Sequence, residues 1–341
     1  MGATKATDSG QGYGSAAASA GDRAAWMTGR VGLMVHWLYP QTRPEHGNGT
    51  ADFDTAVDTF NLDRFLADFA STGAEWMMFT IGQNTGYYTS PNSILDTLSG
   101  PGHTSRRDLV AEMAAGIKKL GKRFVAYLPS EVHFQSDEIK AGFGWNPADQ
   151  SNFQRRYTDF IREYSLRFGT DLDSWWFDGC YDWNEFNNQT YNWALWAEAA
   201  RAGNPDAALA FNDGCFYLRK LLPVSPVQDY LSGEIGWLEN GQIRLGRETE
   251  LEGPGSLYLP SGPFVEDTHC RWHGQVPIDC LWMHTDPGPM PPPRFTDSNL
   301  QTFIDNCVSV GGAVTLNVGI YQEGHLAQAT LKQLSRIKIP G

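Results

Sequence analysis

The 341-residue sequence lacks an apolar run of about 18 residues, the length a transmembrane helix needs, so we expect no membrane span. It has no basic run and no C-x-x-C ligand pair, and its formal net charge is -13. An acidic chain repels phosphate backbones, which argues against nucleic acid as a partner. Aromatic residues are abundant instead, at 13% with 12 Trp, and they can fill a core or offer flat surfaces for stacking.

Several catalytic signatures are also absent: the Gly-x-Ser-x-Gly elbow, the Walker loop and the Rossmann fingerprint. His269, Cys270 and His273 form an H-C-x-x-H cluster, but it has no second ligand pair nearby. We therefore expect neither a metal nor a cofactor.

The five cysteines cannot all pair within the chain, although Cys270 and Cys280 are near enough in sequence for one disulfide. Glycosylation sequons begin at Asn48 and Asn188, which is compatible with a secreted or lysosome-like compartment. The compartment and the oligomeric state stay open.

Short apolar runs alternate with longer amphipathic stretches along most of the chain. Nearly continuous apolar runs are typical of parallel strands that are covered on both faces. The alternation predicts a single-domain (β/α)8 TIM-type barrel over residues 23–341, with a disordered segment at 1–22 and a long irregular insertion around 214–276. The eight expected strands are residues 32–37, 76–81, 123–128, 174–178, 208–213, 226–231, 278–284 and 313–318. The expected helices are residues 61–72, 105–120, 151–168, 189–202 and 296–309.

Polar residues at the carboxyl ends of barrel strands are typical of an active site. The strongest such segment is Trp175 to Gly179, where an aromatic strand ends in Asp178. An aspartate that caps the next loop is the alternative interpretation. Polar residues at other expected strand ends are His36, Gln83, Asn84, Glu131, Asn212, Asp213, Glu234, His284 and Asn317.

Glycoside cleavage requires two carboxyl groups, one that attacks or stabilises the anomeric centre and one that protonates the leaving oxygen. Asp178 is the first candidate. Glu234 and Glu266, both in the irregular region, are candidates for the second, and either one taken alone could equally be a solvated loop glutamate.

Five segments, in order, resemble glycoside hydrolase family 29, the α-L-fucosidases. They are residues 32–37, residues 73–80, the Arg107-Asp108-Leu109 tripeptide, the Trp-Phe-Asp-Gly stretch at 176–179, and residues 308–319 followed by Glu323 and Gly324. The resemblance implies a retaining barrel hydrolase for an α-L-fucoside or a related sugar. It places Asp178 on the nucleophile, and it favours Glu266 over Glu234 as the acid/base.

The resemblance also suggests which residues bind the substrate: His36, Trp37, Gln83, Asn84, Tyr127, Trp176, Trp272 and His284. The sequence departs from the family at Gln83 and Asn84, which stand where the family usually has two histidines, and in ending without the family's C-terminal β-sandwich. Both amides can still hydrogen-bond a sugar. Two rival hypotheses remain, a non-glycosidase enzyme that uses Asp178 as a general acid or base and a catalytically inactive carbohydrate-binding barrel.

Overall fold

The computed structural model describes residues 22–181, 191–214, 222–244 and 257–340. Seven parallel strands form one curled sheet in the order β5-β4-β3-β2-β1-β10-β9. The strands are β1 (Val31–Val35), β2 (Trp76–Thr80), β3 (Arg123–Pro129), β4 (Ser174–Asp178), β5 (Ala208–Phe211), β9 (His273–Pro277) and β10 (Ala313–Asn317).

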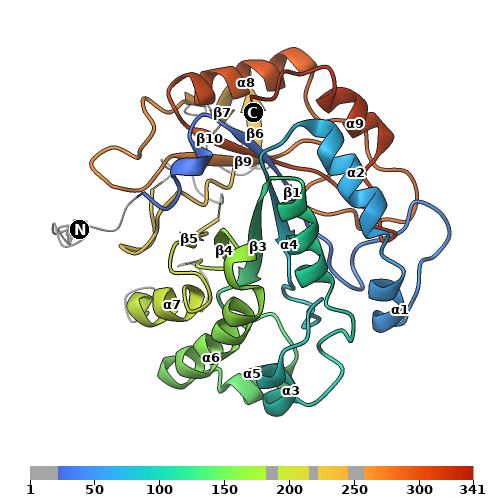
Figure 1. The fold of residues 1–341 in the computed structure, drawn as a ribbon, viewed down its shortest axis with the longest axis vertical. Helices are drawn as coiled ribbons and strands as arrows, with labels where there is room; N and C mark the ends of the chain where they lie inside the picture. Colours follow the sequence, from blue (N-terminus) through green and yellow to red (C-terminus); the bar gives the residue numbers. More distant parts are fainter. Residues whose placement is uncertain (1–21, 182–190, 215–221, 245–256, 341) are drawn as a thin grey trace, which may run out of the picture.

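Helices surround the sheet, and the strands occupy the centre of the molecule (Figure 1). The helices are η1 (Ala25–Met27), α1 (Phe53–Asp58), α2 (Leu62–Thr72), α3 (Ser93–Ser99), α4 (Leu109–Lys119), α5 (Asp137–Phe143), α6 (Ser151–Phe168), η2 (Gly169–Asp171), α7 (Trp193–Ala200), α8 (Asp297–Ser309) and α9 (Gln328–Leu334). None of the helices in the described ranges is both long and apolar enough to cross a bilayer.

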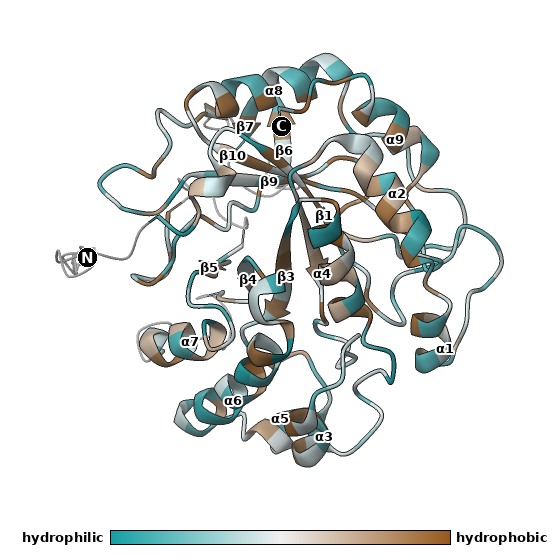
Figure 2. Ribbon diagram, viewed as in Figure 1, coloured by the Kyte–Doolittle hydropathy of each residue, from teal (hydrophilic) through white to brown (hydrophobic). Residues whose placement is uncertain are grey.

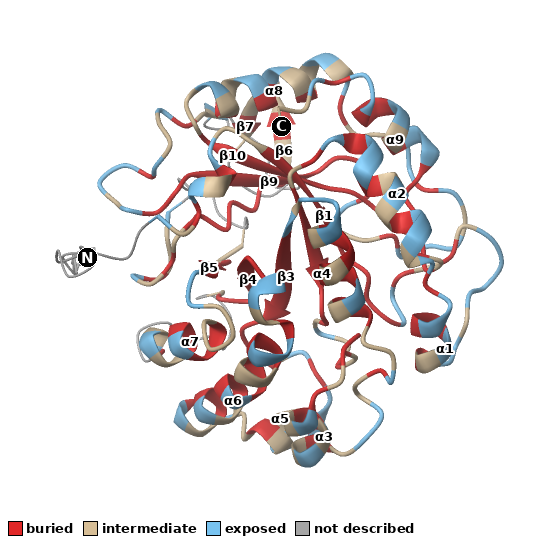
Figure 3. Cartoon of the chain, in the orientation of Figure 1, coloured by how far each residue is buried: buried red, intermediate tan, exposed pale blue. Residues whose placement is uncertain are grey.

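The strands are buried on both faces, which explains why their sequences are nearly continuous apolar runs. Strands and helix faces that turn toward the sheet are apolar and buried, whereas the outer helix faces are polar and exposed (Figures 2 and 3). One core lies between the sheet and the helices. A second core fills the inside of the curled sheet, and its larger members are Met34, Trp76, Met78, Tyr127, Trp176 and Tyr230.

An extended segment, residues 229–235, closes the gap between β5 and β9. The Asp229 amide donates to the Leu209 carbonyl on β5 (2.8 Å), and Tyr230 and Glu234 form parallel bridges with Arg271 and Gln275. The segment has isolated bridges rather than a regular ladder, which is why the sequence around 226–231 indicates a strand only weakly. This strand-like segment, residues 229–235, is called the eighth stave below. It fills the eighth position of the barrel, and the predicted α/β barrel is confirmed.

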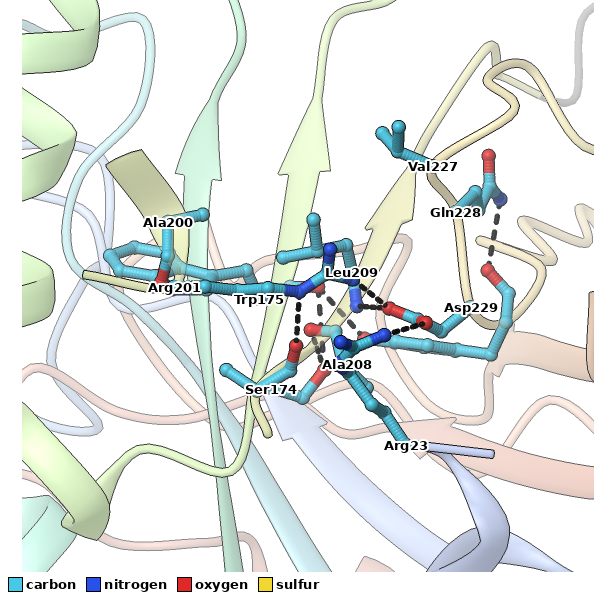
Figure 4. Close-up of polar contacts among 12 residues, drawn as sticks. Arg23, Ser174, Trp175, Ala200, Arg201, Ala208, Leu209, Val227, Gln228 and Asp229 are labelled. Atoms are coloured by element: carbon cyan, nitrogen blue, oxygen red, sulfur yellow. Dashed lines mark hydrogen bonds and ion pairs between the residues drawn. The ribbon is translucent and has the colours of Figure 1, made fainter. Parts of the chain in front are cut away.

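The Asp229 side chain holds the start of this stave in place (Figure 4). Its Oδ2 accepts hydrogen bonds from Arg201 Nη2 (2.5 Å) and from the Leu209 amide (2.8 Å), and Arg23 Nη1 lies 3.6 Å from Oδ1. Burial raises the pKa of Asp229 although both arginines counteract it. The ion pair therefore ties the stave to β5 and to the end of α7.

The prediction of a strand at 278–284 is wrong, because the seventh strand of the sheet is β9, directly before it. The chain leaves the sheet after Pro277, where the carboxylate of Asp279 accepts hydrogen bonds from the amides of Cys280 (2.6 Å) and Gly319 (2.8 Å). These loop contacts turn the backbone away from the strand direction although its residues are apolar.

The insertion predicted around 214–276 is more ordered than expected, because its described part contains β9 and a small antiparallel sheet. That sheet consists of β6 (Trp237–Glu239), β7 (Gln242–Arg244) and β8 (Leu257–Tyr258), in that order. Cys270 and Cys280 are free. They lie beyond opposite ends of β9, whose five residues alone span roughly 13 Å, more than a disulfide reaches. Cys215 and the sequon at Asn188 lie outside the described residues, whereas Asn48 is exposed.

We expect the Asp229→Asn substitution to lower the free energy of unfolding by about 2 kcal/mol, because it leaves the partly buried Arg201 without its counter-charge. Denaturant unfolding of this variant would be compared with the exposed substitution Asp206→Asn, which should stay within about 0.5 kcal/mol of the wild type. An Asp229→Asn variant as stable as its control would show that the ion pair does not hold the stave.

The buried ring of His273 should make the free energy of unfolding depend on pH. Its ring is buried inside the barrel, where Nδ1 faces the Leu231 carbonyl (2.9 Å) and Nε2 faces Thr315 Oγ1 (2.7 Å). Burial lowers its pKa from 6.5 to about 4. Between these values the unfolded chain binds a proton that the folded chain does not, so stability falls as the pH falls from about 6.5 to 4.

We expect this effect to reach roughly 3 kcal/mol at pH 4. The His273→Gln substitution keeps a donor and an acceptor but cannot titrate. Unfolding of both proteins at pH 4 to 7 should therefore show a steeper loss in the wild type, and parallel curves would contradict the assignment.

Candidate active site

Asp178 is the last residue of β4 and points into the barrel mouth with the alternating inward residues Ser174 and Trp176. The chain turns immediately after it at Gly179, whose φ of 87° is rarely adopted by residues with a side chain. A Cβ on Gly179 would also lie 3.0 Å from Glu131 Cγ. Strand and glycine together fix the carboxylate at the carboxyl end of the sheet.

The Asp178 carboxylate accepts hydrogen bonds from four side chains. Oδ2 accepts from Tyr127 Oη (2.5 Å) and Gln83 Nε2 (2.7 Å), and Oδ1 accepts from Tyr181 Oη (2.8 Å) and Asn212 Nδ2 (2.7 Å). A carboxylate offers about four lone-pair sites, so this arrangement matches the ionised form.

Both tyrosines are protonated donors at neutral pH. Burial raises the pKa of Tyr127 and Tyr181 well above 10, and the negative charge of Asp178 raises both further. Tyr127 is also held by stacking on Trp176, with ring centroids 5.0 Å apart. The Trp176 indole in turn donates to the Ser232 carbonyl (3.1 Å), so the stack is tied to the eighth stave.

Asn212 connects Asp178 to a second carboxylate, because its Nδ2 also donates to Glu234 Oε2. Its backbone is fixed to β4 through hydrogen bonds with Phe177 and Cys180. Its Oδ1 accepts the Gly214 amide (3.1 Å), which sets the orientation of the side-chain amide. A flipped amide would point an oxygen at two carboxylates and its NH2 at an N–H, so the network determines the assignment.

The shared nitrogen limits the separation of the two carboxyl groups. Because each nearest oxygen lies within hydrogen-bond reach of the same atom, these oxygens are at most about 6 Å apart. Retaining glycosidases place their carboxyl groups about 5–5.5 Å apart, and inverting ones about 6.5–9.5 Å. The upper limit for the nearest oxygens of Asp178 and Glu234 therefore includes the retaining range. Both residues are nearly buried, at 7% and 9% exposed.

His36 lies on the other side of Tyr127, with the ring centroids 5.1 Å apart. Its Nδ1 is 2.8 Å from Asn317 Oδ1, and Asn317 Nδ2 donates to the Trp282 carbonyl (2.9 Å). Burial is the largest influence on His36 and lowers its pKa, although Asn317 and Asp178 oppose the shift. Because Asn317 Oδ1 can only accept, Nδ1 carries the proton of the neutral imidazole, and Nε2 is left to accept a hydrogen bond from a hydroxyl.

Among the residues predicted to bind substrate, His36, Gln83, Tyr127 and Trp176 gather around Asp178. Asn84 is exposed in the turn after Gln83. The other three predicted residues lie elsewhere. Trp37 is buried against Phe60 and donates to the Gln322 carbonyl. Trp272 is buried directly before β9. His284 packs on Tyr321, and its Nε2 faces the Gly288 carbonyl.

The fold does not place Glu266 beside Asp178. It is exposed in a turn closed by the hydrogen bond from the Val265 amide to the Cys270 carbonyl, and Phe264 pairs with Arg271 just before β9 begins. Asp178 stands at the carboxyl end of a parallel strand, so the two residues occupy opposite ends of the sheet.

Tyr181 and Trp282 were missing from the predicted residues of this site, and Asn212 was predicted only as a polar residue at a strand end. Tyr181 follows Asp178 by three positions, and only the turn at Gly179 brings it back to the carboxylate. Asn212 is recognisable as a polar residue at the end of an apolar run, but its bridging role depends on the eighth stave. Trp282 lies in a segment predicted as strand.

Within the described ranges, no three His, Cys, Asp or Glu side chains converge as a metal site.

No known family profile matches this chain, and no curated protein does. Solved structures do match. The endo-fucoidan hydrolase MfFcnA4 of glycoside hydrolase family 107 is 18% identical with a TM-score of 0.63, over 92% of this chain and 52% of that one. The endo-fucoidan hydrolase P5AFcnA of the same family is 14% identical with a TM-score of 0.63, over 92% of both chains.

The α-L-fucosidase isoenzyme 1 from Paenibacillus thiaminolyticus is 16% identical with a TM-score of 0.59, over 92% of this chain and 74% of that one. In the comparison with MfFcnA4, this chain spans only about half of the length of that protein. At such identities the similarity establishes the fold, and it extends to both groups of enzymes rather than to the α-L-fucosidases alone.

Proposed function

We propose that this chain is a retaining glycoside hydrolase that acts on an α-L-fucoside or a related sugar. The observation that carries the proposal is the carboxyl pair Asp178 and Glu234, whose oxygens accept hydrogen bonds from one amide nitrogen and so lie close enough for a double-displacement site. Its position at the carboxyl ends of barrel strands supports a catalytic role. The sugar is inferred from the sequence resemblance to the α-L-fucosidases and from the names of the structural neighbours.

In the proposed first step, an Asp178 oxygen attacks the anomeric carbon while the protonated Glu234 carboxyl gives its proton to the glycosidic oxygen. The bond to the leaving group breaks, and a glycosyl ester forms on Asp178. In the second step Glu234 removes a proton from water, the water oxygen attacks the anomeric carbon, and the ester bond breaks to release Asp178.

Glu234 replaces Glu266 as the preferred acid/base in this proposal. It is buried beside the nucleophile, whereas Glu266 is exposed at the other end of the sheet. Proton transfer requires hydrogen-bond reach or a single intervening water, and only Glu234 lies on the same side as Asp178.

Hydrolysis of a panel of nitrophenyl glycosides that includes the α-L-fucoside tests the proposal. We expect the wild type to cleave at least one member with retention, and the Asp178→Ala substitution to lower kcat by about 10⁴-fold because the covalent step is lost. Circular dichroism would verify that the variant folds. A wild type without activity on any glycoside, or more than a few per cent of activity in the variant, would favour the non-glycosidase or binding-barrel hypotheses.

The acid/base assignment is tested by matched substitutions at the two glutamates. We expect Glu234→Gln to lower kcat/KM about 10²–10⁴-fold on a poor leaving group and much less on nitrophenyl substrates, whose departure needs no protonation. The same change should remove the basic limb of the pH–rate profile. Glu266→Gln serves as the control and should behave like the wild type. The reverse pattern would restore Glu266 as the acid/base.

A further inference from the structure

Trp282, five residues after the end of β9, has a backbone conformation that a bulky residue rarely adopts. Its φ is 63°, in the left-handed region, where a Cβ approaches the following carbonyl oxygen. The other described non-glycine residues with positive φ are Asn240 and Asp267, whose short polar side chains tolerate it. Tryptophan lacks a short polar side chain of this kind, so the surrounding structure must hold Trp282 in the left-handed conformation.

The groups that hold Trp282 belong to the candidate active site. Asn317 Nδ2 donates to the Trp282 carbonyl (2.9 Å) while Asn317 Oδ1 faces His36 Nδ1 (2.8 Å). The same carbonyl also interacts with the His36 ring and raises its pKa. His36, Asn317 and the Trp282 backbone thus form one polar unit in the barrel mouth.

The Trp282 side chain forms an apolar wall next to this unit. Its ring centroid lies 6.2 Å from that of His36 at an interplanar angle of 60°, and the indole is only half-buried. The preceding Leu281 is 51% exposed. A half-exposed indole beside polar donors is the combination that binds amphipathic ligands.

We propose that Trp282 is a substrate-binding residue that stacks on the apolar C–H face of a pyranose whose hydroxyls contact His36. This assignment rests on the proposed glycosidase function and adds a specificity-determining residue to it. Strained backbone persists where the surrounding structure enforces it, and it concentrates at ligand-binding sites. The indole offers a flat face with little conformational freedom to lose on binding.

The test separates backbone strain from loss of the ring. Trp282→Ala and Trp282→Gly both remove the indole, but only glycine accepts the left-handed conformation without a Cβ. We expect the glycine variant to melt about 2 °C above the alanine variant. Both should weaken calorimetric binding of L-fucose, and raise KM on the cleaved glycoside, roughly tenfold. Trp282→Phe should restore most of the affinity.

Trp237→Ala provides a matched control. Trp237 is another half-buried indole, packed on Phe295 and Arg294 beside the small antiparallel sheet. Its removal should lower the melting temperature without changing the affinity for L-fucose.

Glycoside turnover by the wild type with unchanged affinity and KM in the Trp282 variants overturns this assignment alone. A glycine variant that melts no higher than the alanine variant removes the strain argument and overturns it as well. A wild type that neither cleaves glycosides nor binds a monosaccharide overturns the proposed function together with it.

Discussion

The amide of Asn212 is the interaction on which the arrangement of the site depends. Two carboxylates repel each other, and in a buried mouth that repulsion is strong unless a donor lies between them. Asn212 supplies two N–H groups from one nitrogen, and its backbone and Oδ1 are both fixed by main-chain hydrogen bonds. The separation of Asp178 and Glu234 is therefore a property of the sheet rather than of two independent side chains.

The position of Glu234 depends on the contacts that residues 229–235 make with β5 and β9. Residues 229–235 have no regular ladder, so their register against β5 and β9 rests on isolated bridges and on the ion pairs of Asp229. Gly233, directly before Glu234, has a φ of 70°, and Gly233 and Ile235 both form main-chain hydrogen bonds with Gln275 on β9. The two ends of the segment are therefore anchored separately, and the β9 contacts set where the second carboxylate lies.

The sequence allowed most of the barrel to be predicted, because strands buried on both faces carry their signal in their own residues. Asp178 was predictable for a related reason, since a carboxylate that ends an aromatic strand before a glycine stands out locally. Glu234 could not be separated from Glu266 in this way. Its strand is defined by tertiary contacts with Leu209 and Gln275, and no pattern within the segment records them.

The four hydrogen bonds to Asp178 constrain any reaction in which it attacks, because a carboxylate oxygen must free a lone pair to form a bond. Asn212 cannot leave without also releasing Glu234, and Tyr127 is held by its stack on Trp176. Gln83 is half-buried, comes from the loop after β2, and donates through the same nitrogen to Tyr127 and Asp178. In the proposed mechanism a substrate hydroxyl oxygen accepts the Gln83 N–H in place of Asp178 Oδ2, because that exchange frees a lone pair for attack and leaves the hydrogen bonds of Asn212 to both carboxyl groups intact.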